Sequence, residues 1–147
     1  MIVLVGKLSG VQKLGLEDHD LDQLRAGDVV HIETPVNPTG EARDLAYYRA
    51  RAHAAGAYLV VDSTLAPPPL QNPLSFGADL VLHSGTKYIG GHSDLMCGIL
   101  VVHPDRVREG WLETPYAERL VLGAVMGNLE GWLGLRSLRT LELRVRR

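Results

Sequence analysis

The chain has 147 residues, a length typical of a single domain. Hydrophobic residues make up 46% and charged residues 22% of the chain, and the formal net charge is −2, a balance that favours neither nucleic acid nor an anionic membrane as a partner. The single cysteine, Cys97, excludes an intrachain disulfide, and no apolar run is long enough to span a bilayer. The first apolar run precedes its lysine, which is the reverse of a secretory signal. We therefore expect a cytoplasmic protein.

Four short apolar runs rich in β-branched residues predict strands. The first covers residues 29–32, and the second is AYLVVD, which is apolar on both faces until Asp62. ADLVLH and GILVVHP follow as the third and fourth. Strands that alternate with helices indicate an α/β fold with a mostly parallel sheet and flanking helices.

Helical periodicity occurs in two parts of the chain. EARDLAYYRARAHAAG, residues 41–56, has apolar side chains at helical spacing and ends at a glycine that can cap a helix. From about residue 116 to 147 the chain is expected to be helical. The side chains expected on its buried face are Leu120, Met126, Leu129, Leu133 and Leu138.

Polar groups follow three of the predicted strands at the point where each strand ends. Asn37 comes shortly after the first, Asp62 closes the second, and Ser84-Gly85-Thr86-Lys87 follows the third. Ligands of open α/β sheets bind at the carboxyl ends of the strands, where parallel strands would bring these groups to one edge. Each group alone has an ordinary explanation as a turn former, a helix cap or a solvated charge. Together they match the needs of one ligand.

Spacing excludes three other kinds of site. The nucleotide pattern GxxxxGK[ST] has its hydroxyl residue after the lysine, whereas Thr86 precedes Lys87. The tripeptide His-Ser-Asp at residues 92–94 cannot form a catalytic relay, because its members are adjacent in the chain. The histidines and Cys97 lack metal-ligand spacing, so no metal site is expected.

The cofactor that remains is pyridoxal 5′-phosphate (PLP). It needs a lysine for a Schiff base, a carboxylate against the pyridine nitrogen, and hydroxyl and backbone N–H groups for its phosphate. Lys87, Asp62 and the Ser84/Thr86 pair fit these needs in that order.

At these residues the sequence resembles a known family, the cystathionine γ-synthase-like (Cys/Met metabolism) branch of fold-type-I PLP-dependent enzymes. The segments ETPVNPTG, VVDSTLAPPPLQNPLSFGADLVLHSGTKYIGGHSD and LRSLRTLELRV look like successive signature blocks of that family, in the right order and spacing. The resemblance covers nearly the whole chain, and the middle block is the most specific.

The resemblance implies a role for each group at the strand ends. Lys87 would be the catalytic lysine that forms the Schiff base, and Asp62 would contact the pyridinium nitrogen. Ser84 and Thr86 would bind the phosphate, and Asn37 would lie beside the cofactor's phenolic oxygen.

The chain departs from the family pattern in four residues and in length. Family members are roughly twice this size or more and have two domains, so residues 1–147 are expected to be an incomplete PLP-binding large domain, with residues 116–147 leading toward a missing C-terminal domain. The substrate-binding arginine and the aromatic that stacks on the cofactor are expected outside this chain. The family usually has asparagine at Ser63, alanine at Gly85, and glycine at Cys97 and Ser137.

The function implied is elimination or replacement at the β or γ carbon of a sulfur amino acid or an activated homoserine. Its partners would be a small amino-acid substrate and further copies of the chain, as a dimer or tetramer in the full-length family. One alternative is a truncated, inactive remnant that binds the cofactor weakly or acts only through subunit contacts. Another is a transaminase of the same fold type, against which GTKYIGGHSD argues.

Overall fold

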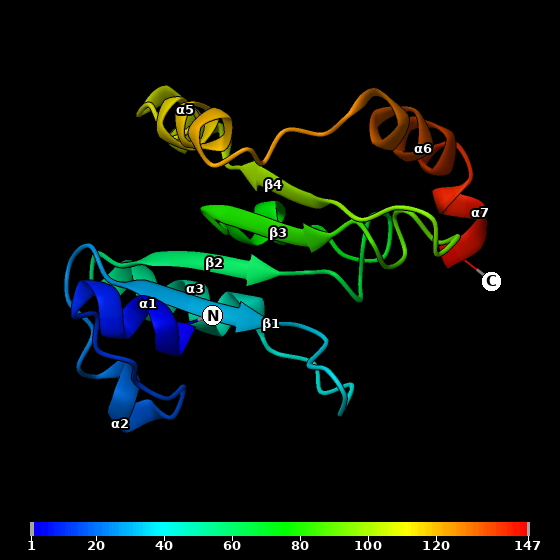
Figure 1. Cartoon of the computed structure of the whole chain (residues 1–147). Coiled ribbons are helices and arrows are strands. Elements are labelled where there is room, and N and C mark those ends of the chain that lie inside the picture. Colours follow the sequence, from blue (N-terminus) through cyan, green and yellow to red (C-terminus); the bar gives the residue numbers. More distant parts are fainter. Residues whose placement is uncertain (1, 147) are drawn as a thin grey trace.

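The computed structural model describes residues 2–146, and at its centre is a four-stranded sheet (Figure 1). The strands lie side by side in chain order: β1 (Val29–Glu33), β2 (Tyr58–Asp62), β3 (Leu80–Ser84) and β4 (Gly98–Val102). The first three are parallel, and β4 is antiparallel to β3. The predicted α/β fold with a mostly parallel sheet is therefore confirmed.

The register brings the carboxyl ends of the parallel strands to one edge. Glu33 at the end of β1 is paired with Asp62 at the end of β2, and Asp62 is paired with Leu82 in β3. Strand β3 then continues to Ser84. The polar residues that close β2 and β3 are consequently neighbours in space.

Helix α3 (Leu45–Ala54) crosses between β1 and β2 and is shorter than the predicted helix at residues 41–56. It begins after Asp44, whose Oδ1 accepts hydrogen bonds from the N–H groups of Ala46 and Tyr47 at 2.9 and 3.1 Å. It ends before Gly56, whose φ of +68° suits the left-handed conformation that closes many helices. The capping aspartate explains why Glu41, Ala42 and Arg43, which precede it, remain outside the helix.

The hydrophobic core lies between α3 and one face of the sheet. Its buried members are Leu21, Val30, Ile32, Leu45, Tyr48, Ala52, Ala57, Leu59, Val61, Ala78 and Val81. Strand β2 is buried on both faces, since Val60 is buried as well. Strand β1 is not, because Val29 and His31 are exposed on its other face.

Four short helical segments were not predicted from the sequence. They are α1 (Ile2–Ser9), α2 (Asp18–Leu21), the 3₁₀ helix η1 (Pro73–Phe76) and α4 (Pro104–Arg108). With eight residues or fewer, each is too short to display the periodicity that identifies a helix.

The C-terminal part is helical, as predicted, but it is divided into α5 (Glu113–Val121), α6 (Asn128–Leu138) and α7 (Leu141–Val145). The break contains Gly123, with a φ of +68°. The predicted buried face is wrong, because four of its five side chains are 48–64% exposed: Leu120, Met126, Leu129 and Leu138. Helices α5 and α6 lie apart from the α3 face of the sheet (Figure 1), and the core leaves their apolar side chains uncovered.

Candidate functional site

Two of the predicted site residues, Asp62 and Ser84, are joined through a third residue, Thr64, at the carboxyl ends of the strands. The Thr64 N–H donates to Asp62 Oδ1 at 3.0 Å, and the Ser84 N–H donates to Thr64 Oγ1 at 2.7 Å. Thr64 is buried, so these hydrogen bonds are shielded from water. The carboxylate at the end of β2 and the hydroxyl residue at the end of β3 are thus held in a fixed relation.

Thr64 was missed in the sequence analysis. A signal for it exists in Asp-Ser-Thr, because an aspartate commonly accepts a hydrogen bond from the backbone N–H two residues further on. That the threonine hydroxyl then reaches the next strand could not be inferred from this local pattern.

Lys87 lies in a tight turn directly after β3. Its N–H donates to Ser84 O at 3.1 Å, and its carbonyl accepts from the Gly91 N–H at 2.7 Å. The Gly90 N–H donates to Gly85 O at 2.7 Å and closes the same turn. The Lys87 side chain itself is exposed, so its amine is accessible to a ligand.

Two of the departures from the family pattern, Gly85 and Cys97, pack against one another. A β-carbon at position 85 would lie 2.2 Å from Cys97 Sγ, so an alanine there would require the thiol to move. Burial raises the pKa of the Cys97 thiol, which keeps it protonated and a poor nucleophile. The small residue at 85 and the larger one at 97 therefore belong together, and Cys97 acts as a packing residue.

An open cavity of about 910 Å³ lies beside the Lys87 turn. Thr86 and Lys87 line it together with Leu65, which follows β2, and Arg144, from α7. Its remaining lining residues are Tyr88, Gly91, Ser93, Asp94, Leu95 and Met96. A hydroxyl and an amine thus share one wall of a space that is large enough for a small-molecule ligand.

Among the described residues, Asn37 is not linked to the other predicted site residues. It lies in an exposed turn after β1, at the same edge of the sheet. Within residues 2–146, no hydrogen bond joins it to Asp62 or to the Lys87 turn.

Beneath the strand ends, Ser63 is the centre of a buried hydrogen-bond network. Its hydroxyl donates to Ala66 O at 2.8 Å and accepts from Gln71 Nε2 at 2.9 Å. Gln71 Nε2 also donates to Thr34 O at 3.2 Å, which ties the loop after β2 to the end of β1. The serine that stands where the family usually has asparagine thus has a structural role in this chain.

His83, the residue before Ser84, is buried against the same loop. Its Nδ1 lies 3.1 Å from the Ser63 carbonyl oxygen. Because a carbonyl only accepts, Nδ1 carries the proton and donates it to that oxygen. Burial lowers the pKa of His83, so the neutral ring is favoured directly below the site.

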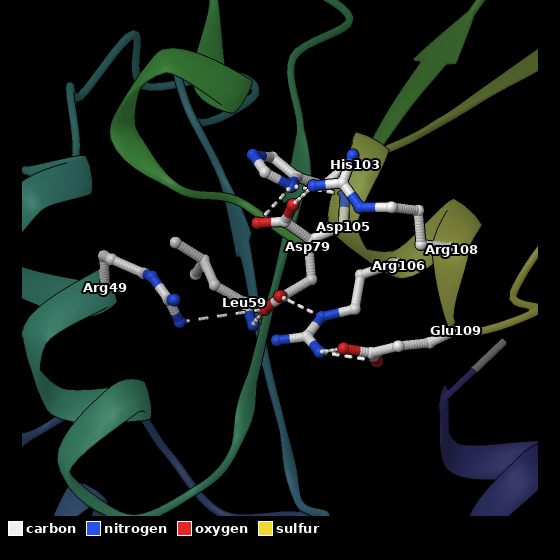
Figure 2. A network of polar contacts seen from close by, with 8 residues as sticks. All are labelled: Arg49, Leu59, Asp79, His103, Asp105, Arg106, Arg108 and Glu109. Carbon is white, nitrogen blue, oxygen red and sulfur yellow. Dashed lines mark hydrogen bonds and ion pairs between the residues drawn. The ribbon is translucent and has the colours of Figure 1, made fainter.

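A cluster of charges lies at the amino-terminal ends of the strands, opposite the candidate site (Figure 2). Asp79, which is 3% exposed, accepts from the Leu59 N–H at 2.7 Å and from Arg106 Nε at 2.8 Å. The carboxylates of Asp79 and Glu109 raise the pKa of Arg106 above its already high value. Since Leu59 lies near the start of β2 and Asp79 precedes β3, this network is remote from Asp62 and Lys87 and has a structural role.

Two kinds of feature are absent from residues 2–146. No three or more His, Cys, Asp or Glu side chains are grouped so that they could hold a metal ion. No helix in that part of the chain has both the length and the apolar character needed to cross a membrane.

Comparison with known proteins gives a family match over most of the chain. The model of the family described as "Cys/Met metabolism PLP-dependent enzyme" matches residues 16–147. A cystathionine gamma-synthase/O-acetylhomoserine (thiol)-lyase of Bacillus subtilis is 41% identical over 117 residues, which cover 80% of this chain and 30% of that protein. A cystathionine gamma-lyase of Saccharomyces cerevisiae is 42% identical over 139 residues, which cover 87% of this chain and 33% of that protein.

Solved structures agree with the sequence comparison. Cystathionine gamma synthase from Xanthomonas oryzae pv. oryzae, in complex with aminoacrylate and cysteine, has a TM-score of 0.81 and 36% identity over 97% of this chain and 37% of its own. Apo CalE6, a methionine gamma lyase from Micromonospora echinospora, has a TM-score of 0.72 and 43% identity over 79% of this chain and 31% of its own. The chain thus spans about a third of the length of the relatives it matches.

Proposed function

Since the chain belongs to the Cys/Met metabolism PLP-dependent enzyme family, we propose that it is the cofactor-binding part of an enzyme acting on a sulfur amino acid or an activated homoserine. The reaction is an elimination or a replacement at the β or γ carbon, of the type named in its relatives. The observation that carries the proposal is the cavity wall formed by Thr86 and Lys87, next to the linked ends of β2 and β3. The substrate would be a small amino acid, and further copies of the chain would be its partners.

The residues at this edge fit the chemical groups of PLP. Lys87 would carry the cofactor covalently, and the Asp62 carboxylate would face the ring nitrogen. The hydroxyls of Ser84 and Thr86 would hold the phosphate, and Asn37 would lie beside the phenolic oxygen. When bound, PLP supplies an electron sink for the negative charge that develops on the substrate's α-carbon.

The chain's own groups contribute orientation and proton transfer. A carboxylate at Asp62 favours a positive charge on the group that it faces, and the Thr64 N–H holds it in place. Once it is no longer bound to the cofactor, the amine of Lys87, which lines the cavity, would accept a proton at one carbon of the substrate and return it at another. The Ser84 and Thr86 hydroxyls lie before it in the same segment and would fix the ligand's position relative to that amine.

The test is chemical labelling of the lysine. Treatment with PLP followed by borohydride reduction and peptide mapping should place the label on Lys87, rather than on Lys7 or Lys13, the other two lysines of the chain. Lys87→Arg should abolish the label because an arginine keeps the charge but forms no imine, whereas Asp62→Asn should retain it because the amine is intact. A label distributed over Lys7 and Lys13 would refute the proposal.

A further inference from the structure

A single arginine of the last helix binds the turn that carries Lys87. Arg144 Nη1 donates to Tyr88 O at 2.6 Å, and Nη2 donates to Ile89 O at 3.1 Å. These two carbonyls belong to the residues that follow Lys87 directly. The contact therefore joins α7 to the candidate site across more than fifty residues of chain.

The same guanidinium also donates to residues of the C-terminal part of the chain to which it belongs. Its Nη2 donates to Ser137 O at 3.0 Å, and its Nε donates to Thr140 Oγ1 at 3.1 Å. An arginine has five N–H donors, and these contacts use four of them. Although Arg144 lines the cavity, it is engaged with the protein rather than free to bind an anionic ligand.

Gly91 provides the space for this contact. A β-carbon at Gly91 would lie 2.0 Å from Arg144 Nη1 and 3.1 Å from the Tyr88 carbonyl oxygen. Its φ of +70° also favours glycine. The turn is thus shaped both by its own backbone and by the guanidinium packed on it.

We propose that Arg144 is a positioning residue for Lys87. The Lys87 carbonyl accepts from the Gly91 N–H, and the carbonyls of the next two residues are held by Arg144, so the backbone on the C-terminal side of Lys87 is fixed. Fixing that backbone fixes the direction in which the lysine side chain leaves it. A planar guanidinium can reach two carbonyls at once, which a lysine ammonium on a flexible stem does less well. The inference rests on the proposed function in so far as Lys87 carries the cofactor.

The first experiment needs no cofactor. Amide hydrogen exchange is compared in the unsubstituted chain, Arg144→Ala, Arg144→Lys and the control Arg146→Ala. Arg146 lies two residues further along the chain, and its side chain pairs with the exposed Glu142 at 2.8 Å. The Gly90 and Gly91 amides should exchange about tenfold faster or more in Arg144→Ala, since charged hydrogen bonds to the turn are lost. Arg144→Lys should fall in between, and Arg146→Ala should match the unsubstituted chain.

The second experiment reports the orientation of the bound group. After loading with PLP, the circular dichroism of the cofactor's visible absorption band is measured per bound cofactor. A lysine held in one direction gives a strong signal, and Arg144→Ala should lose most of it while borohydride still traps label on Lys87. Arg144→Lys keeps the charge and most of the side-chain stem, so it tests the same point if the alanine variant does not fold.

The outcomes distinguish a residue that positions Lys87 from one that only stabilises the turn. Unchanged exchange at Gly90 and Gly91 in both Arg144 variants would overturn the inference. Faster exchange with an undiminished dichroism per cofactor would reduce Arg144 to a stabilising contact and would also overturn it. If the unsubstituted chain takes no label at Lys87, the proposed function fails, and the exchange result alone decides whether Arg144 sets the turn.

Discussion

At the scale of single residues, His83 connects the candidate site with the pH dependence of stability. Its ring is buried directly before Ser84 and donates to the Ser63 carbonyl. Burial favours the uncharged ring, and this lowers the pKa of His83 from its ordinary value of about 6.5. A depressed pKa contributes stability that is complete above the unfolded-state pKa and is lost as the pH falls below it.

We therefore expect the free energy of unfolding to decrease as the pH is lowered below about 6.5, and part of this decrease to come from His83. In His83→Asn the amide can still donate to Ser63 O but does not titrate, so the decrease should be smaller. Urea unfolding at several pH values measures it, with His53→Asn on the exposed side of α3 as the control. An identical pH dependence in His83→Asn and the unsubstituted chain would contradict this assignment.

Candidate site residues that carry a chemical group could be proposed from the sequence, and residues that only support them could not. Lys87, Asp62, Ser84 and Thr86 were predicted because an amine, a carboxylate and hydroxyls at strand ends match the needs of one ligand, and their roles toward that ligand stay a prediction. Thr64 and Arg144 were missed since their contacts cross from one element to another. Such contacts depend on how elements pack, which no local pattern of residues encodes.

At the scale of elements, the Asp79 network holds the amino-terminal edge of the sheet together (Figure 2). Asp79 joins β2 through the Leu59 N–H and α4 through Arg106, and Arg49 of α3 approaches to 3.9 Å. Arg106 also packs over the ring of Tyr58, with its Cζ 5.2 Å from the ring centroid. Three elements thus converge on a single buried carboxylate.

Asp79→Ala should destabilise the fold by about 3 kcal/mol, because it leaves the Leu59 N–H without its acceptor and Arg106 without its buried partner. The control is Asp105→Ala, at a residue that Figure 2 also shows. Asp105 forms an exposed ion pair with Arg108, and such a pair should contribute less than about 1 kcal/mol. Denaturant unfolding monitored by circular dichroism compares the two. Equal losses in both variants would show that burial of Asp79 has no special weight.

The elements themselves were predictable to different degrees. Strands β1 to β4 were found because short β-branched runs between turn residues have few other structures available to them. The existence of helix after residue 116 was also right. Its buried face was wrong because periodicity shows that a helix has an apolar side but not whether anything in the chain covers that side.

At the scale of the whole molecule, exposed apolar side chains are concentrated around β4 and α5. Strand β4 is last in the sheet order, so within the part of the chain that the structure describes, its outer edge pairs with no other strand. An open trough of about 1110 Å³ lies beside it, between β4 and α5. Leu100 and Leu122, both of which line the trough, are 54% and 78% exposed. The relatives are about three times as long, so they have further chain that can cover a surface of this kind.

An open strand edge beside an exposed apolar trough favours association with another copy. We therefore expect the 147-residue chain on its own to self-associate at micromolar concentration, and Leu100→Lys to weaken this association by placing a charge on the β4 edge. Leu8→Lys is the matched control, because Leu8 is 80% exposed but lies on α1, at the other end of the sheet (Figure 1). Sedimentation velocity over a concentration series measures the effect: Leu100→Lys should shift the distribution toward monomer, and Leu8→Lys should leave it unchanged. A monodisperse monomer for the unsubstituted chain, or an equal shift in both variants, would show that the surface around β4 and α5 does not drive association.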